Sequence, residues 1–312
     1  MKFIKNFREI TKGDVRIAGG KGASLGEMLN AKIPVPPGFV VLATAFDRFL
    51  EETDLLQDVQ ARLDQVNYKD TNSVDRASNE IRDLIADTKF PADLGKEITS
   101  EFKKLKAEYV AVRSSATAED SKTASWAGEL ETYLNTTKKE LLNNVKKCWS
   151  SLFTPRAIFY RHEKKLLKSH VSVAVVVQKM VQSEVSGICF TVHPVTKDKN
   201  QMILEAGWGL GEAIVSGQIT PDSYVVDKRD WSIMDINIAE QTMMITKKGK
   251  VTAQIKLPKA KGGKQKLTGK QIIELAKLCG LIEKHYKFPC DIEWAMEKRK
   301  FYITQSRPIT TL

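Results

Sequence analysis

Four polar side chains near the C-terminus are spaced as strand residues that share a face. Asp291 and Glu293 lie two residues apart in PCDIEWAMEKRKFYITQSRPI, and Gln305 and Arg307 lie two apart after a charged turn. Side-chain direction in a strand repeats every two residues, so each couple lies on one face. If the turn is odd in length and centred on Arg299, antiparallel pairing places Glu293 opposite Gln305. The same pairing places Asp291 opposite Arg307.

These groups have the chemistry of a site for Mg²⁺ bound to a polyphosphate. Carboxylate and carboxamide oxygens are hard ligands that suit Mg²⁺, while a guanidinium neutralises phosphate charge. The alternative is an exposed hairpin in which Asp291 and Arg307 form an ordinary ion pair. The other face is expected to be apolar, so the polar face meets either solvent or a ligand. We expect that apolar face to contain Ile292, Trp294, Tyr302 and Thr304.

A second candidate for anion binding lies between residues 110 and 135. YVAVRSS predicts a short strand that ends at Arg113, where a fork of donors can meet an anion. Small and hydroxylated residues follow, and Ala127 and Gly128 would let the backbone approach a ligand closely. This pattern predicts a phosphate-covering loop, and an exposed turn rich in serine and threonine is the alternative.

A third candidate is the segment GGKGASLG at residues 19–26, which places Lys21 in a turn before a helix expected over 23–31. Oriented N–H groups and an ammonium at such a turn can hold phosphate. The spacing is not that of a Walker A loop, so a purely structural turn is the alternative.

A candidate adenine site lies where the strand VSVAVVVQKMV ends. The residues from Gln178 through Lys179 and Met180 to Val181 could offer backbone N–H and C=O groups to the edge of an adenine ring. Met180 would lie against the ring face and Glu184 near the ribose hydroxyls. The alternative is the frayed end of a buried strand.

The elements expected around these residues are helices in the first half and strands in the second. Segments between residues 44 and 105 repeat apolar residues every three to four positions. Successive strands follow residue 171, and one helix is expected over 268–286. This order predicts an α/β (α+β) fold whose second half is rich in antiparallel strands. We assign 1–170 to an N-terminal subdomain with the phosphate-covering loop, and 171–312 to a C-terminal subdomain with the adenine hinge and metal-binding hairpin.

Composition describes a globular chain of 312 residues with 42% hydrophobic content and a formal charge of +11. Lysines concentrate between Lys247 and Lys270, where a solvated hairpin is favoured over a nucleic-acid patch because no aromatic residues interleave. The four cysteines show no CxxC spacing, which favours reduced structural thiols. With no signal peptide and no apolar run long enough to span a bilayer, we expect a cytoplasmic protein without a membrane partner.

A series of motifs, taken together and in order, resembles the ATP-binding domain of the phosphoenolpyruvate synthase and pyruvate phosphate dikinase family. The motifs are GGKGASLGEM, PVPPGFVV, VAVRSSATAED, WAGELETYLN, VVVQKMV, SGICFTVHP, GWGLGEAIVSGQITPD and DIEWAMEKRKFYITQSRPI. The resemblance covers nearly the whole chain. It implies an ATP-grasp-like fold in which two subdomains close on Mg-ATP.

The resemblance also implies roles for individual residues. Those expected to act on phosphate are Lys21, Arg113 and Arg307. Those expected in the phosphate-covering loop are Gly128 and Thr132. Those expected to hold adenosine are Gln178, Lys179, Met180, Val181 and Glu184. Those expected to bind Mg²⁺, or to support its ligands, are Glu293, Gln305 and Asp291.

In that family the domain cleaves ATP between the α- and β-phosphates and passes a pyrophosphoryl group to a histidine on a separate swivelling domain. A third domain then makes phosphoenolpyruvate from pyruvate. This chain contains neither the Gly-rich Thr-Ser-His motif nor length for a pyruvate-binding barrel, so both are expected on separate domains or chains. Glu129 stands where the family often has glutamine, and a carboxylate facing phosphate would be repulsive.

The sequence therefore suggests the ATP-binding component of a phosphoenolpyruvate synthase-like phosphotransferase. One alternative resembles rifampin phosphotransferase, whose final acceptor is an antibiotic hydroxyl. Another is a non-catalytic nucleotide-binding module that regulates a partner. Nucleic-acid binding near Lys261 is less favoured and predicts a steep salt dependence with no need for Mg²⁺.

Overall fold

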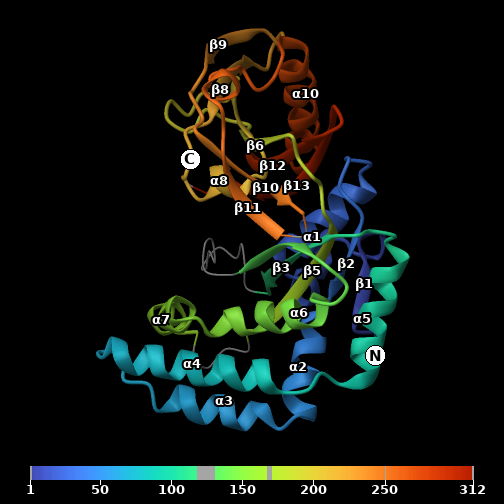
Figure 1. Ribbon diagram of the computed structural model, residues 1–312, viewed down its shortest axis with the longest axis vertical. Helices are drawn as coiled ribbons and strands as arrows, with labels where there is room; N and C mark the ends of the chain where they lie inside the picture. Colours follow the sequence, from blue (N-terminus) through green and yellow to red (C-terminus); the bar gives the residue numbers. More distant parts are fainter. Residues whose placement is uncertain (1, 118–130, 167–170, 250, 311–312) are drawn as a thin grey trace. The chain divides into compact units, whose positions relative to one another are not determined.

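The computed structural model describes residues 2–117, 131–166, 171–249 and 251–310 (Figure 1). The chain divides into two compact units, the first containing residues 1–27 and 37–180 and the second containing residues 28–36 and 181–312. The division follows Met180 rather than residue 170, because β5 (Val173–Lys179) pairs with two strands of the first unit.

The first unit is built on a five-stranded antiparallel sheet. Its strands in spatial order are β1 (Ile4–Asn6), β2 (Gly38–Val41), β5, β3 (Val110–Ala116) and β4 (Thr132–Thr136). Strand β5 is rich in valine, and its residues 173–177 are each 0% exposed. A continuous β-branched run suits a strand that is covered on both faces.

A layer of helices packs on one face of this sheet (Figure 1). Its members are α2 (Ala43–Glu52), α3 (Leu55–Asp64), α4 (Thr71–Asp87), α5 (Ala92–Lys104), α6 (Leu141–Ser150) and α7 (Pro155–Glu163). Trp149 of α6 is 0% exposed and lies 5.4 Å from Phe46 and 5.1 Å from Phe49 and Phe90, measured between ring centroids. Aromatic pairs of this kind each add about 1 kcal/mol beyond their buried area. The helices predicted between residues 44 and 105 are confirmed.

The N-terminal region contains a longer helix than the one predicted over 23–31. Helix α1 spans Val15–Asn30 and is interrupted at Gly19, where φ is 68° and ψ is 170°. Short 3-10 helices span Phe7–Glu9, Lys12–Asp14 and Ser151–Phe153. The interruption places Lys21 in the first turn of the second helical piece, two residues after Gly19.

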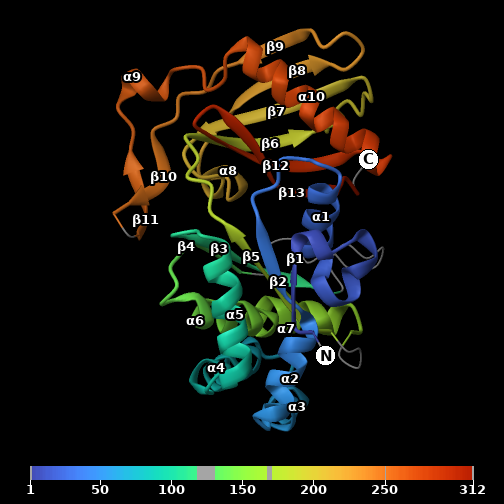
Figure 2. The same ribbon diagram turned by 90° about the vertical axis from the view of Figure 1, so that its right-hand side faces the viewer.

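The second unit is built on a six-stranded antiparallel sheet (Figure 2). Its strands in spatial order are β13 (Lys300–Pro308), β12 (Cys290–Glu297), β6 (Val185–Phe190), β7 (Gln201–Trp208), β8 (Asp222–Asp227) and β9 (Ile233–Asn237). Helix α10 (Gly269–Tyr286) packs on one face through Ile272, Leu275 and Cys279. Thr268 caps its N-terminus in a capping box with Gln271, so the helix predicted over 268–286 is confirmed. The remaining short helices are α8 (Glu212–Val215) and α9 (Lys259–Gly262).

The lysine-rich segment forms a separate antiparallel ribbon of β10 (Met243–Lys248) and β11 (Val251–Lys256). A buried ion pair anchors the chain just after it. The Lys266 ammonium lies 2.7 Å from an Asp222 oxygen, and both side chains are 0% exposed. Lys266 also donates to the Ala239 carbonyl at 2.6 Å, and the Tyr224 hydroxyl donates to Asp222. A buried pair is tolerated when its polar atoms are satisfied in this way.

The described residues thus form the mixed helix and antiparallel-sheet fold that the sequence predicts. Among them, none of the helices combines the length and apolar character that a membrane span requires. The four cysteines are free and buried.

Candidate functional site

The turn that carries Lys21 packs directly on β3, the strand that carries Arg113. The Ser115 hydroxyl donates to the Ala18 carbonyl at 3.1 Å and accepts from the Gly22 amide at 3.4 Å. A Cβ on Gly19 would lie 2.4 Å from the Ser115 carbonyl oxygen, so only glycine permits this approach. The fold therefore brings together two candidate phosphate-binding segments that are far apart in the sequence.

Arg113, Thr132 and Gln178 share the sheet face opposite the helical layer. Arg113 lies opposite Thr132 on β4 and opposite Val176 on β5, and Gln178 lies opposite Ala111. The intervening residues of these strands point into the helical core. Arg113 is 8% exposed, so its guanidinium is largely desolvated and acts strongly on a nearby anion. Three predicted site residues thus lie on one face of one sheet.

The Cys148 thiol shows that Lys21 and Glu131 lie within electrostatic range of the same buried point. Burial raises the pKa of this thiol well above its ordinary value, Glu131 raises it further, and Lys21 opposes the rise. Cys148 also donates to the Glu131 carbonyl at 3.8 Å. Lys21 and Glu131 therefore both act electrostatically on the buried Cys148 thiol.

Two of the sequence expectations in this region concern Gly128 and Glu129. Both residues lie outside the described ranges, so the assignment of Gly128 to a phosphate-covering loop stays a prediction, as does repulsion by Glu129.

The predicted adenine-binding strand end has two of its amides already engaged. Lys179 donates to the Pro37 carbonyl at 2.8 Å, and Met180 donates to the Tyr109 carbonyl at 3.1 Å. These two N–H groups therefore do not serve a base, and any adenine contact falls to carbonyl groups or to Val181. Glu184 is exposed, and its side chain accepts from the Lys298 amide at 3.3 Å. Its contact with ribose stays a prediction.

The pairing predicted for the C-terminal hairpin is confirmed, while the predicted turn is wrong. Glu293 lies opposite Gln305, and Asp291 lies opposite Arg307. Glu297 pairs with Lys300, so the turn has two residues rather than an odd number. Its residues Lys298 and Arg299 have φ of 51° and 63°, as a type I′ hairpin turn requires.

A β-bulge restores the pairing that an even turn would otherwise shift. Ile303 lies opposite Trp294 and Gln305 lies opposite Glu293, so Thr304 is an extra residue of β13. Phe301 and Ile303 consequently face the core, whereas Gln305 and Arg307 lie on the other face, opposite Glu293 and Asp291.

One part of the predicted apolar face is therefore wrong. Tyr302 lies opposite Ala295, which shares the face of Glu293, and it does not join Ile292 and Trp294. The aromatic partner of Trp294 in the core is Phe301, with ring centroids 5.7 Å apart. The predicted alternation failed because the bulge reverses the side-chain parity within β13.

Asp291 and Arg307 form the ion pair that the sequence offered as an alternative. The Asp291 Oδ2 atom accepts from the Arg307 Nη2 atom at 2.7 Å and from Nε at 2.9 Å. Burial raises the pKa of Asp291, Arg307 opposes this rise, and Glu293 adds to it. The pair fixes the Arg307 fork while its side chain remains 40% exposed.

Glu205 on β7 joins this face and was not identified from the sequence. It lies opposite Ile188, which in turn lies opposite Glu293, so the row continues to Gln305. Burial raises the pKa of Glu205, and the charge of Asp291 adds to the rise. A charged residue inside the apolar run QMILEAGW was the available signal, because a strand buried on both faces seldom carries one.

The donor set of this face fits Mg²⁺ bound to phosphate better than a closed metal site. Within the described ranges, no group of three histidine, cysteine, aspartate or glutamate side chains could enclose an ion. Mg²⁺ is commonly held by one or two carboxylates together with substrate phosphates and waters. Glu293 and Gln305, side by side on neighbouring strands, provide this kind of partial ligand set.

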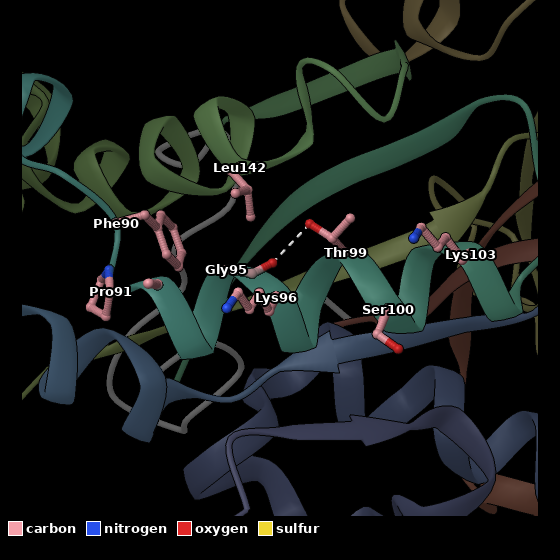
Figure 3. Close-up of a pocket in the computed structure, with 9 residues that line it drawn as sticks. Phe90, Pro91, Gly95, Lys96, Thr99, Ser100, Lys103 and Leu142 are labelled. Carbon is pink, nitrogen blue, oxygen red and sulfur yellow. Dashed lines mark hydrogen bonds between the residues drawn. The ribbon is translucent and has the colours of Figure 1, made fainter.

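A hollow elsewhere in the first unit is separate from all these residues. A pocket of about 490 Å³ runs along α5 between Phe90 and Lys103 (Figure 3). Gly95, Lys96 and Thr99 line it together with Leu142 of α6, and the Thr99 hydroxyl donates to the Gly95 carbonyl at 2.8 Å. The pocket contains none of the predicted site residues, so it does not mark their location.

Comparison with known proteins agrees with the motifs. The family described as "Pyruvate phosphate dikinase, AMP/ATP-binding domain" matches residues 15–312. A probable phosphoenolpyruvate synthase of Archaeoglobus fulgidus is 49% identical over 97% of the chain, which covers 41% of that protein. One of Methanocaldococcus jannaschii is 47% identical over the whole chain, which covers 27% of that protein.

A rifampicin phosphotransferase of Bacillus subtilis is 39% identical over 99% of the chain, which covers 36% of that protein. The chain thus spans less than half the length of each of these curated relatives. Their match extends across both compact units, so the candidate phosphate-binding residues and the hairpin residues lie within one region of similarity.

Proposed function

Because the chain belongs to the pyruvate phosphate dikinase AMP/ATP-binding domain family, we propose that it binds Mg-ATP and transfers a phosphoryl or pyrophosphoryl group to a histidine on a separate domain or chain. The observation that carries this proposal is the packing of the Lys21 turn on Ser115, two residues after Arg113. A structural turn alone has no need of a largely buried guanidinium on the neighbouring strand.

In the first unit, Lys21 and Arg113 neutralise the phosphate charge that develops as a phosphate bond breaks. Such catalysis consists mainly of positioning and electrostatic stabilisation. Thr132, opposite Arg113, offers a hydroxyl on the same face. Gly128 belongs to the proposed phosphate-covering loop.

In the second unit, Glu293 and Gln305 hold Mg²⁺. When bound, the ion neutralises phosphate oxygens and orients them. Asp291 acts on Arg307, because its carboxylate holds the guanidinium in one orientation through two hydrogen bonds to Oδ2. Arg307, held in this orientation, acts on the phosphate charge.

Adenosine is held by the segment from Gln178 to Val181, with Glu184 at the ribose. Since the amides of Lys179 and Met180 are engaged, carbonyl oxygens and the Val181 amide are the groups left for the adenine edge.

The histidine-bearing domain and the final acceptor are part of the same proposal. Relatives named phosphoenolpyruvate synthase favour pyruvate as the acceptor, and the relative named rifampicin phosphotransferase favours an antibiotic hydroxyl as the alternative. A regulatory module without turnover is a further alternative, although it would not require both the phosphate and the metal residues.

The test is ATP turnover by the purified chain with Mg²⁺, alone and with a separately supplied histidine domain of the family, resolving AMP from ADP. We expect AMP only when the histidine domain is present, and its loss in Glu293→Ala. Tight Mg-ATP binding without turnover would favour the regulatory module. Absence of ATP binding would overturn the proposal, and salt-sensitive nucleic-acid binding without Mg²⁺ would replace it.

A further inference from the structure

Glu131 joins three elements of the first unit at the start of β4. Its Oε1 atom lies 2.7 Å from the Arg82 Nη2 atom, and its Oε2 atom accepts from the Tyr133 hydroxyl. Its backbone carbonyl accepts from the Ser114 amide at 3.1 Å and from the Ser114 hydroxyl at 2.7 Å. The side chain and the main chain of one residue therefore connect α4, β3 and β4.

The arrangement holds Thr132 from both sides. Tyr133 lies opposite Val112, whose side chain belongs to the helical core, so Tyr133 and Glu131 point toward the helical layer. Thr132, between them, points to the opposite face with Arg113. Arg82 thus holds Glu131 from the helical side of the sheet, and Glu131 in turn accepts a hydrogen bond from Tyr133, the other neighbour of Thr132.

These contacts act on β4, a strand whose pairing alone specifies its register weakly. β4 is the edge strand of its sheet, and its pairing with β3 is irregular between Val110 and Val112. Asn135 has φ of 50°, which interrupts the extended backbone of β4. A slip of one residue would move Thr132 to the helical face and take it away from Arg113.

We propose that Arg82 is a positioning residue for phosphate binding, which acts through Glu131 and Tyr133 to keep Thr132 opposite Arg113. The inference rests on the proposed function, because Thr132 and Arg113 matter as a pair only if this face binds phosphate. Arg82 itself touches no nucleotide in this scheme.

Measurements of stability and of nucleotide affinity distinguish a positioning role from that of an ordinary ion pair. The Arg82 and Glu131 side chains are 31% and 27% exposed, and ion pairs of such exposure contribute little to the free energy of unfolding. A positioning role predicts a loss of nucleotide affinity that is out of proportion to any loss of stability.

The first experiment compares Arg82→Met with Arg76→Met, since Arg76 is exposed on the same helix. We expect Arg82→Met to raise the dissociation constant for Mg-ATP about tenfold, as a displaced binding group does. Arg76→Met should match the unaltered chain, and both variants should keep its melting temperature within a few degrees. Equal affinities for the two variants would overturn the proposal.

A second series tests the route through Glu131. Arg82→Lys should recover part of the lost affinity, and Glu131→Gln, which keeps an acceptor for Tyr133, should resemble Arg82→Met. In the Glu131→Gln background, Arg82→Met should cause no further loss; additive losses would overturn the route. If the unaltered chain binds no Mg-ATP, the proposed function fails; if it binds and Arg82→Met binds equally well, only the positioning role fails.

Discussion

Gly19 is the residue on which the placement of Lys21 depends. Its φ of 68° and ψ of 170° lie in a region that is essentially restricted to glycine. Gly217 has nearly the same φ, 69°, but an added Cβ would meet nothing within 4 Å there. Substitution of Gly217 therefore tests backbone strain alone, whereas substitution of Gly19 adds the effect of close packing.

We expect Gly19→Ala to lower the free energy of unfolding by about 3 kcal/mol, and Gly217→Ala by about 1 kcal/mol. The larger cost arises because the Gly19 Cβ would overlap the Ser115 backbone. Urea denaturation measures both values, and calorimetry should show weaker ATP binding for Gly19→Ala alone. Equal costs would mean that the turn relaxes away from β3.

Glu205 gives a prediction about pH. Its pKa is raised in the folded state, first by burial and then by Asp291, so the folded chain holds its proton more tightly than the unfolded chain does. This contribution to stability is present below the unfolded pKa and is lost as pH rises through the folded pKa.

In metal-free buffer, Glu205→Gln should therefore raise the free energy of unfolding at pH 7 relative to the unaltered chain, and raise it less at pH 4. Urea denaturation at the two pH values measures the difference, with the exposed Glu240→Gln as the control. A variant that is less stable at pH 7 than at pH 4 relative to the unaltered chain would contradict this reasoning.

At the scale of elements, the bulge in β13 decides which residues meet across the hairpin. The double variant Glu293→Cys and Gln305→Cys, with its native cysteines kept reduced, should form a disulfide between the two new cysteines on mild oxidation. Directly opposite strand residues have a Cα–Cα distance that a disulfide can span. Mass spectrometry of the digested protein detects the bond. Preferential bonding of Glu293→Cys with Thr304→Cys instead would show that the bulge is absent.

The hairpin also shows how far the sequence could lead. Polar alternation correctly predicted the facing pairs at Glu293 and Asp291, because the extra residue at Thr304 offsets the even length of the turn. The length of the turn was predicted wrongly, since Lys298 and Arg299 lack the Asn-Gly or Asp-Gly signature of a type I′ turn. The bulge at Thr304 left no signal in the sequence. The two-residue turn shifts the register of the hairpin by one residue, and the extra residue at Thr304 shifts it back, so neither feature could be recognised from the pairs alone.

The contacts between segments that are distant in the sequence could not be predicted. Local pattern identified Lys21 and Arg113 separately, but the packing of their segments depends on Ser115 and on backbone angles at Gly19 that no periodicity encodes. Arg82 was also missed, because a charged residue on an amphipathic helix normally belongs to its solvated face. The helices and strands themselves were predictable because their apolar spacing is regular.

At the scale of the whole molecule, the proposal assigns different tasks to the two units. Lys21→Met should weaken ATP binding about tenfold or more while leaving the stimulation by Mg²⁺ intact, because the ammonium acts on phosphate. Glu293→Gln should instead remove most of that stimulation, because a carboxylate ligand is lost. Calorimetric titration with ATP in Mg²⁺ and in EDTA separates the two effects.

Identical behaviour of these two variants would argue against distinct tasks. So would ATP binding by the unaltered chain that is indifferent to EDTA. The place where the chain divides, after Met180, could not be read from the motif order, because it depends on the strand pairing of β5.

Thr304 has a consequence for changes in chain length. Removing this one residue would let Ile303 and Gln305 become consecutive while each kept its partner, Trp294 and Glu293, and its own side of the sheet. Adding one residue beside Thr304 would leave β13 two residues longer than its partner strand at that point. A gene encoding this hairpin can therefore lose a codon here and keep its polar face, but it has little freedom to gain one.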